Sequence, residues 1–127
     1  MISGNTVQDK ADDFALRIIR LYNYLKEHKQ EFVLSKQLLR SGTSIGANIT
    51  EAECAFSKEE FHSKMGIAYK ECAESKYWIN LLLKAEYITE AQAESLLTDC
   101  NEILKLLASI NKTVQFQKDI AKQFRNK

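Results

Sequence analysis

The chain has 127 residues with no proline and four glycines, and 45% of its residues are apolar. This is the size of one small domain with a hydrophobic core. A sheet protein of this length needs many turns marked by proline and glycine, so the composition predicts long, uninterrupted helices instead. Eighteen Lys and Arg residues against seventeen Asp and Glu give a net charge of +1, which excludes a generically basic nucleic-acid binder.

The sequence gives no sign of a membrane span or of a metal site. The longest strongly apolar stretch, residues 78–83, is far shorter than the roughly 20 residues that a membrane span needs. The start of the chain has neither a basic segment nor an apolar run, so we expect a cytoplasmic protein without membrane contact. Cys54, Cys72 and Cys100 lack the paired spacing of a zinc site or redox couple, so we expect small buried side chains and no cofactor.

The first predicted helix covers residues 6–28. Its apolar and small residues recur at steps of three and four, which is typical of one helix face. They are Val7, Ala11, Phe14, Ile18, Leu21 and Leu25.

The second predicted helix covers residues 35–55, with Ser35 as its N-cap. Its apolar positions are Leu38, Ile45, Ile49, Ala52 and Phe56. Gly42 and Gly46 form a small-xxx-small pair, which predicts close approach of another helix. With Ser44 they also match the GxSxG nucleophile elbow, but that chemistry needs a preceding strand and a downstream acid and histidine. We therefore predict no catalytic residue.

Two capping boxes predict the starts of the third and fourth helices. Ser57 with Glu60 precedes a helix over residues 58–85, and Thr89 with Gln92 precedes one over residues 90–114. The third apolar seam is Phe61, Met65, Ala68, Cys72, Ser75, Ile79 and Leu82. The fourth is Ala93, Leu97, Cys100, Leu104, Leu107, Ile110 and Val114.

The connections between these helices are short. Consecutive helices are therefore expected to run antiparallel and side by side. The sequence predicts an all-α fold, an antiparallel up-down-up-down four-helix bundle, as a single domain over residues 1–127.

The end of the chain, residues 112–127, is predicted to be a weakly amphipathic basic tail. Its only acid is Asp119. Its basic residues are Lys112, Lys118, Lys122, Arg125 and Lys127. These cations either complement the C-terminal end of a helix dipole or contact an anionic partner.

Three further positions have specific interpretations. Glu59 and His62 lie three residues apart on one helix, as metal ligands do, but a di-iron bundle needs that pattern twice, so a di-metal enzyme is only a remote alternative. Asn48 lies in the second seam, where a buried amide is expected to fix register or oligomeric state. Trp78 lies away from the third seam, and an exposed tryptophan there would indicate an interface.

One run of the second helix carries a family resemblance. It contains Arg40, Ser44, Ile45, Asn48, Ile49 and Glu51. Together with Phe61, Ile67, Ala68 and Glu74 downstream, it resembles the bacterial four-helix bundle proteins known as 23S rRNA intervening-sequence proteins, or the S23 family. The characteristic run of that family reads approximately R-x-x-x-S-I-x-x-N-I-A-E, from which Thr50 departs.

The resemblance covers roughly residues 14–107. It implies a four-helix bundle that assembles into a ring, a homopentamer as in the related accessory variability proteins of diversity-generating retroelements. No enzymatic activity is established for the family.

Two functions are open at this point. The first is a non-enzymatic oligomeric scaffold whose partners are its own copies and a protein or nucleic acid, with the family run setting packing and assembly. The alternative is RNA or DNA binding, or binding of a nucleic-acid enzyme, by a basic face that the ring repeats. The candidate contacts are Lys29, Lys36, Arg40, Lys112, Lys118, Lys122 and Arg125.

Overall fold

The computed structural model describes residues 6–125, and this range contains four α-helices and no strand. The helices are α1 (Val7–His28), α2 (Leu34–Glu53), α3 (Lys58–Lys84) and α4 (Glu90–Arg125). The predicted all-α fold with four helices is confirmed, and the first three helices end within two residues of their predicted bounds. None of the four described helices is long and apolar enough to cross a lipid bilayer.

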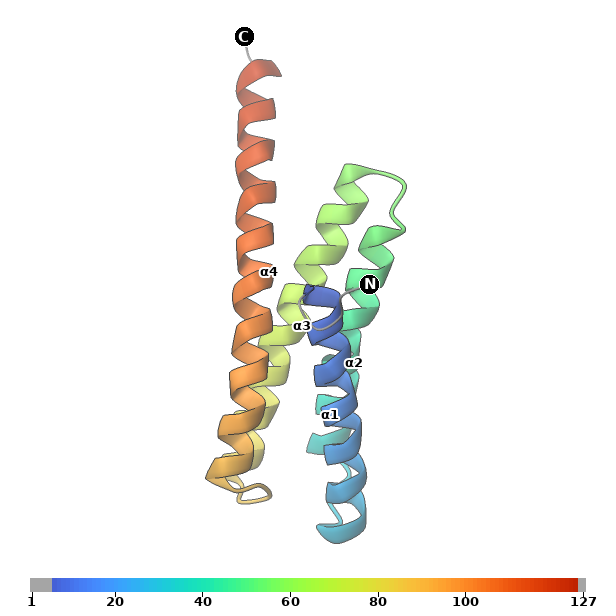
Figure 1. The fold of residues 1–127 in the computed structure, drawn as a ribbon, viewed down its shortest axis with the longest axis vertical. Helices are drawn as coiled ribbons and strands as arrows, with labels where there is room; N and C mark the ends of the chain where they lie inside the picture. The colour runs from blue at the N-terminus through green and yellow to red at the C-terminus, as the bar shows by residue number, and fades with distance from the viewer. Residues whose placement is uncertain (1–5, 126–127) are drawn as a thin grey trace.

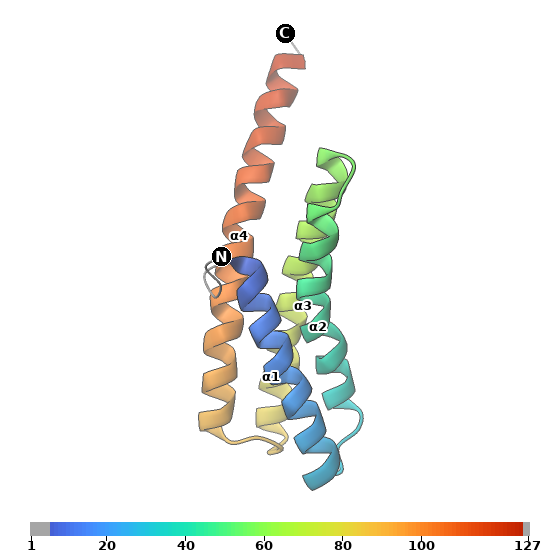
Figure 2. The ribbon, with the colours of Figure 1, turned by 45° about the vertical axis from the view of Figure 1, so that its right-hand side comes forward.

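Each of the four helices packs against two others, so that the contacts run in a closed cycle around the bundle. α2 packs against α1 and α3, and α4 packs against α3 and, least extensively, α1. Figures 1 and 2 show the α1–α2 and α3–α4 turns at one end of the molecule and the α2–α3 turn toward the other. The last part of α4 extends beyond the other helices.

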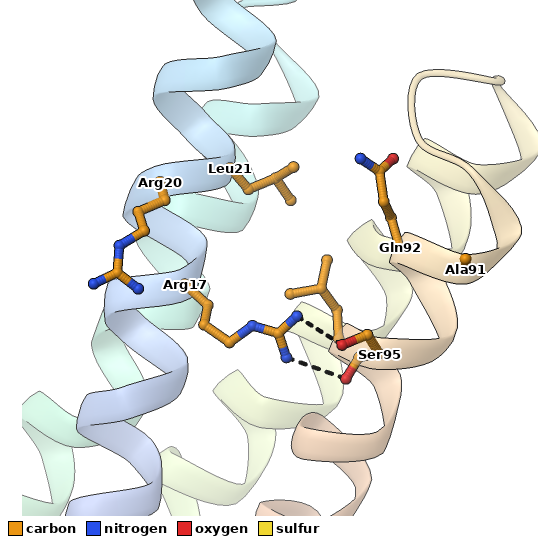
Figure 3. Close-up of a pocket in the computed structure, with 7 residues that line it drawn as sticks. Arg17, Arg20, Leu21, Ala91, Gln92 and Ser95 are labelled. Atoms are coloured by element: carbon orange, nitrogen blue, oxygen red, sulfur yellow. Dashed lines mark hydrogen bonds between the residues drawn. The ribbon is translucent and has the colours of Figure 1, made fainter.

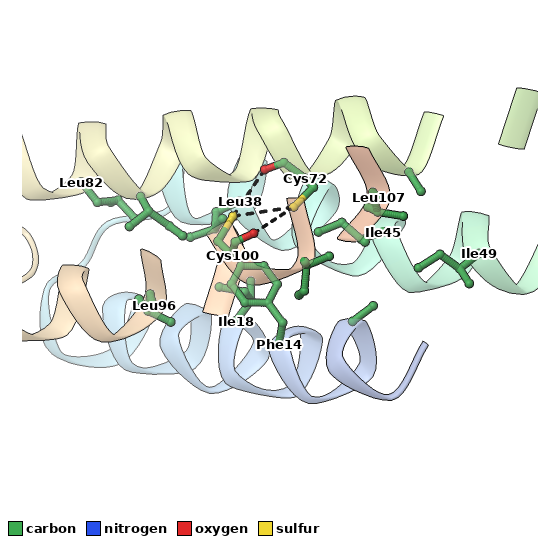
Figure 4. Close-up of a cluster of buried hydrophobic side chains, with 14 of the residues drawn as sticks. Phe14, Ile18, Leu38, Ile45, Ile49, Cys72, Leu82, Leu96, Cys100 and Leu107 are labelled. Carbon is green, nitrogen blue, oxygen red and sulfur yellow. Dashed lines mark hydrogen bonds between the residues drawn. The ribbon is translucent and has the colours of Figure 1, made fainter. Parts of the chain in front are cut away.

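The core contains most of the predicted seam residues, but on α4 Leu96 and Ile103 are buried where Leu97 and Leu104 were predicted. Figure 4 shows Phe14 and Ile18 of α1 within one cluster with Cys72 of α3 and Cys100 of α4. The Cys72 and Cys100 sulfurs lie 3.8 Å apart, and their hydrogen bond together with burial raises the pKa of Cys72, so this thiol stays protonated and packs as a small apolar group. The large side chains that are fully buried include Phe14, Ile18, Leu25, Leu38, Ile45, Ile49, Ile79, Leu82, Ile103 and Leu107.

The two glycines of α2 allow α1 to approach closely, as their spacing predicts. A Cβ atom at Gly42 would lie 3.1 Å from Ile18 Cγ1, which is tighter than an ordinary van der Waals contact. At Gly46 it would lie 2.8 Å from Asp12 Oδ1. The Gln8 amide, also on α1, donates a hydrogen bond to the Gly46 carbonyl at 3.2 Å. Close packing of α1 on α2 therefore depends on the missing side chains.

Both predicted capping boxes are present, one of them with a shifted contact. The Thr89 hydroxyl accepts from the Gln92 amide at 3.2 Å, and the Gln92 side chain accepts from the Thr89 amide at 2.9 Å. The Ser57 hydroxyl accepts from the Glu60 amide at 3.0 Å. The Glu60 carboxylate, however, accepts from the amide of Phe56 at 3.1 Å, one residue before the predicted partner.

The predicted N-cap of the second helix was wrong. Ser35 lies inside α2, and the side chain of the residue at the cap position, Val33, makes no capping hydrogen bond. The carboxylate of Glu31 takes this role, because it accepts from the amides of Val33 at 3.0 Å, Leu34 at 2.6 Å and Ser35 at 2.9 Å. Burial alone would raise the pKa of Glu31, but these backbone hydrogen bonds outweigh it and hold the pKa below its ordinary value.

The predicted end of the second helix was wrong as well. α2 ends at Glu53, and the chain then turns toward the cap of α3. Phe56, assigned to the second seam, is 99% exposed as a result. Cys54, expected to be buried, is an exposed thiol next to the same turn.

The predicted fourth helix ended at residue 114 and was followed by a weakly amphipathic basic tail, but the structure is helical as far as Arg125. α4 has 36 residues and ends eleven residues beyond the predicted boundary at 114. The physical reason is that the chain has no proline and no glycine after Gly66, so nothing in this segment terminates a helix. Lys127 lies outside the described residues.

We expect Gly42→Val to lower the free energy of unfolding by about 2 kcal/mol, because the added methyl groups force Ile18 and α1 outward. Denaturant unfolding at fixed protein concentration measures this change. Gly66→Val is the matched control, because a Cβ at Gly66 meets nothing within 4 Å, and it should change stability by less than about 0.5 kcal/mol. Equal effects of the two substitutions would contradict the close α1–α2 contact.

We expect Glu31→Gln to cost about 1 kcal/mol of stability at neutral pH. The folded pKa of Glu31 is depressed below its ordinary value of 4.5, so its contribution is present above that pH and is lost as the pH falls through the folded pKa. The difference between the two proteins should therefore shrink as the pH falls below 4.5. Unfolding curves measured from neutral to acidic pH test this expectation, with Glu27→Gln at an exposed carboxylate as the control. A difference in stability that does not change with pH would be inconsistent with the capping role of Glu31.

Candidate functional site

The family run on α2 combines a buried apolar side with polar groups bonded to their own helix. Ile45 and Ile49 are buried in the core. The Ser44 hydroxyl donates to the Arg40 carbonyl at 2.7 Å, and the Asn48 amide donates to the Ser44 carbonyl at 2.8 Å. Asn48 is half-buried and bonds within α2, so its amide makes no contact between helices in the protomer, and a part in oligomeric state stays a prediction.

Arg40 links α2 to α3. Its guanidinium donates to the Glu71 carboxylate at 3.1 Å and also to the carboxylate of Glu74. The same Glu74 carboxylate accepts from the indole nitrogen of Trp78 at 2.9 Å. Trp78 is half-buried against the core, so its ring packs within the protomer and does not form the exposed interface considered from the sequence. Two acids neutralise Arg40, which makes it a poor nucleic-acid contact.

The last residue of the run, Glu51, also contacts α3. Its carboxylate lies 2.8 Å from the Lys64 ammonium. This hydrogen bond raises the pKa of Lys64, as expected for a lysine held beside a carboxylate. Arg40 and Glu51 therefore connect two separate points of α2 to α3, and in the protomer the run serves helix packing.

A cavity of about 420 Å³ lies between α1 and α4. Figure 3 shows Arg17 reaching across it from α1 to Ser95 on α4. The Arg17 guanidinium donates to the Ser95 hydroxyl at 2.8 Å and to the Asp99 carboxylate at 2.6 Å. These contacts hold Arg17 as a bridge between α1 and α4.

Glu59 and His62 do not form a metal centre with other described residues. Within residues 6–125 no three His, Cys, Asp or Glu side chains come together as metal ligands do. The Nδ1 atom of His62 is nevertheless buried and has no hydrogen-bond partner among the described residues. Burial lowers the pKa of His62, and the charges of Lys118 and Lys58 lower it further against the opposing effect of Glu59.

Apart from Arg40, the basic residues proposed from the sequence fall into two separate groups. Lys29 and Lys36 are exposed near the α1–α2 turn, at one end of the molecule in Figure 1. The second group lies on the last part of α4, whose end points away from the α1–α2 turn in Figure 1. Its members are Lys112, Lys118, Lys122 and Arg125. One protomer therefore does not unite all seven candidates in a single patch.

Three members of the second group, Lys118, Lys122 and Arg125, border the largest cavity described, which we call the α3–α4 cleft. It has a volume of about 970 Å³ and lies between the start of α3 and the end of α4. Four cations and two carboxylates line it together with His62; the charged residues are Lys58, Lys118, Lys122, Arg125, Glu59 and Asp119. Sequence reasoning missed Lys58 and considered His62 only as a metal ligand, because their distance from α4 along the chain hides the contact.

We expect Arg40→Ala to lower the free energy of unfolding by about 1 kcal/mol, because it removes a partly shielded pair of ionic contacts between α2 and α3. It should also shift the fluorescence of Trp78, the single tryptophan, since Glu74 loses its cationic partner. Lys36→Ala, on an exposed cation of the same helix, is the control. An Arg40→Ala protein with unchanged stability and emission would argue against this network.

Comparison with known proteins agrees with the fold and with the run on α2. The sequence model of the 23S rRNA-intervening sequence protein family matches residues 4–109. A protein of unknown function from the S23 ribosomal protein family of Bacteroides thetaiotaomicron VPI-5482, with a crystal structure at 1.70 Å resolution, is 55% identical. That match covers 84% of this chain and 99% of the other, with a TM-score of 0.83. No curated protein matches this chain. The chain belongs to the 23S rRNA-intervening sequence protein family.

Proposed function

We propose that this protein is a non-enzymatic, cytoplasmic helical scaffold that forms homo-oligomers and acts through protein or nucleic-acid contacts. In this proposal the protomer is an antiparallel up-down-up-down bundle, which the placement of its turns at the two ends supports. The observation that carries the proposal is an exposed apolar stripe on α4.

The stripe consists of Leu106, Phe116, Ile120 and Phe124. Phe116 is 65% exposed and Phe124 is 74% exposed. Phe116 follows the core residue Leu107 by nine positions, about two and a half helical turns, so it points to the opposite side of α4. The apolar side of α4 thus turns away from its own bundle along the extension, and large exposed apolar surfaces of this kind mark contact sites.

A second copy of the chain suits this stripe. Leu106, Thr113 and Ile120 are spaced by seven residues, and Phe116 and Phe124 fall between or beside them, as in the seam of a coiled coil. A net charge of +1 gives little electrostatic repulsion between copies. The number of copies, five, is proposed from the family resemblance alone, because most of the stripe lies beyond residue 109, where the match to the family model ends.

We expect the wild-type protein to have a mass several times its protomer mass of 14.6 kDa, about five times for a ring of five copies. Phe116→Ser with Phe124→Ser should shift it toward the monomer, because the stripe loses its apolar surface. Light scattering after size-exclusion chromatography measures both. Phe32→Ser, at an exposed phenylalanine outside the stripe, is the control. A strictly monomeric wild type would refute the scaffold proposal.

A second candidate function is nucleic-acid binding. The observation that favours it is that Lys118, Lys122 and Arg125 lie together beside the cleft. Within residues 112–125, Asp119 is the one acidic residue. Lysine and arginine contacts to phosphates release counterions and so support affinity. A ring would repeat this group once per protomer, so a protein with a low net charge would still present a basic face.

A further inference from the structure

The α3–α4 cleft has the chemistry of an anion site. Of its lining residues, Lys58 and His62 come from the first turns of α3, and Lys118, Lys122 and Arg125 come from α4. We propose that this cleft binds the phosphodiester backbone of a single-stranded nucleic acid. The inference rests on the second candidate function and assigns it to one place in the protomer.

The cations of the cleft form a row, which favours an extended anion over a single one. Lys118, Lys122 and Arg125 follow one another at steps of four and three residues, so they share one side of α4. From first to last they span about 10 Å along the helix axis. Lys58 faces this row from the other wall. One small anion cannot contact all four cations, whereas successive phosphates of a strand can.

An exposed aromatic ring next to the cleft favours a nucleic acid over other polyanions. Phe56 is 99% exposed and lies with Lys58 around a shallow surface pocket. Proteins that bind single strands combine a basic groove along the backbone with aromatic side chains on which bases stack. A polyanion without flat bases would gain no such stacking. Phe56 and the cation row together therefore point to a strand with bases.

His62 gives the cleft a pH-dependent contact. Its Nδ1 atom is buried and has no hydrogen-bond partner in the described range. Lys58 and Glu59 on α3, and Lys118, Asp119, Lys122 and Arg125 on α4, are the charged groups around it. Burial and the charges of Lys118 and Lys58 hold the pKa of His62 below its ordinary value, so the ring is neutral at pH 7. A bound phosphodiester favours the protonated ring, so affinity should rise as the pH falls.

The central test uses a fluorescent single-stranded RNA of about 12 nucleotides as the probe and fluorescence anisotropy as the measurement. With three to four phosphate contacts, log K should fall with log salt with a slope of about −2 to −3. Lys118→Gln with Lys122→Gln should weaken binding at low salt more than tenfold and reduce the slope by about 1.4. Lys29→Gln with Lys36→Gln makes the same charge change at the other end of the molecule and should leave both values close to wild type.

Two further variants separate the parts of the site. Phe56→Ala should weaken RNA binding by about tenfold without changing the salt slope, because it removes stacking and no charge. His62→Gln should remove the rise in affinity between about pH 7.5 and pH 6, a range in which a phosphodiester does not titrate. Circular dichroism and light scattering on each variant establish that fold and assembly are unchanged.

The outcomes distinguish the cleft from the broader functions. If substitution of either lysine pair weakens RNA binding equally, or only the Lys29 and Lys36 substitutions weaken it, the cleft is not the binding site. Nucleic-acid binding by the protein would still stand. Equal competition by polyglutamate would replace the nucleic acid by an acidic peptide, and equal competition by inorganic phosphate would reduce the site to one for small anions. If the protein binds no RNA at low salt, both nucleic-acid binding and the proposed role of the cleft are rejected. The scaffold proposal is tested separately, by the mass of the assembly in solution.

Discussion

The length of α4 is the constraint on which the functional surfaces of this protein depend. α4 has 36 residues, whereas its neighbours α1 and α3 have 22 and 27. At 1.5 Å per residue, α4 is about 54 Å long and the other two are about 33 and 40 Å long. Its final turns therefore have no neighbour on most sides, so both an apolar stripe and a row of cations stay exposed there.

α2 organises the rest of the bundle through different chemistry on its two sides. Toward α1 it presents Gly42 and Gly46, which bring the two backbones close together. Toward α3 it presents Arg40 and Glu51, which form ion pairs at two separate points. The small volume of the glycines thus determines the α1–α2 contact, and charge contributes to the α2–α3 contact. This division explains why the family run mixes small, apolar and charged residues within twelve positions.

The two surfaces of the extension are compatible with one another. Lys118 is two positions from Phe116, about 200° around the helix, so the cation row and the apolar stripe lie on opposite sides of α4. Assembly through the stripe would leave the proposed cleft open to a nucleic acid. The match to the family model ends at residue 109, so most of the extension lies outside the region shared with the family. The family model therefore covers the bundle and leaves most of the extension unmatched.

Local patterns determined the helices, because seams and caps depend on residues at most four positions apart. The Thr89 box and the spacing of Gly42 and Gly46 were predictable for this reason. The extent of α4 was also implicit in the missing helix breakers, but its charge pattern was taken as that of a tail. Even the cap by Glu31 was missed, since Ser35 satisfies the same local rule.

Only the tertiary structure decided which distant side chains meet. The partners of Arg40 lie more than thirty positions away, and the walls of the cleft, around Lys58 and Lys118, lie sixty positions apart. The amino-acid sequence therefore determined four amphipathic helices and the family. Helix packing decided which cations are neutralised and which remain available, because charge pairing depends on distances in space that the order of residues does not contain.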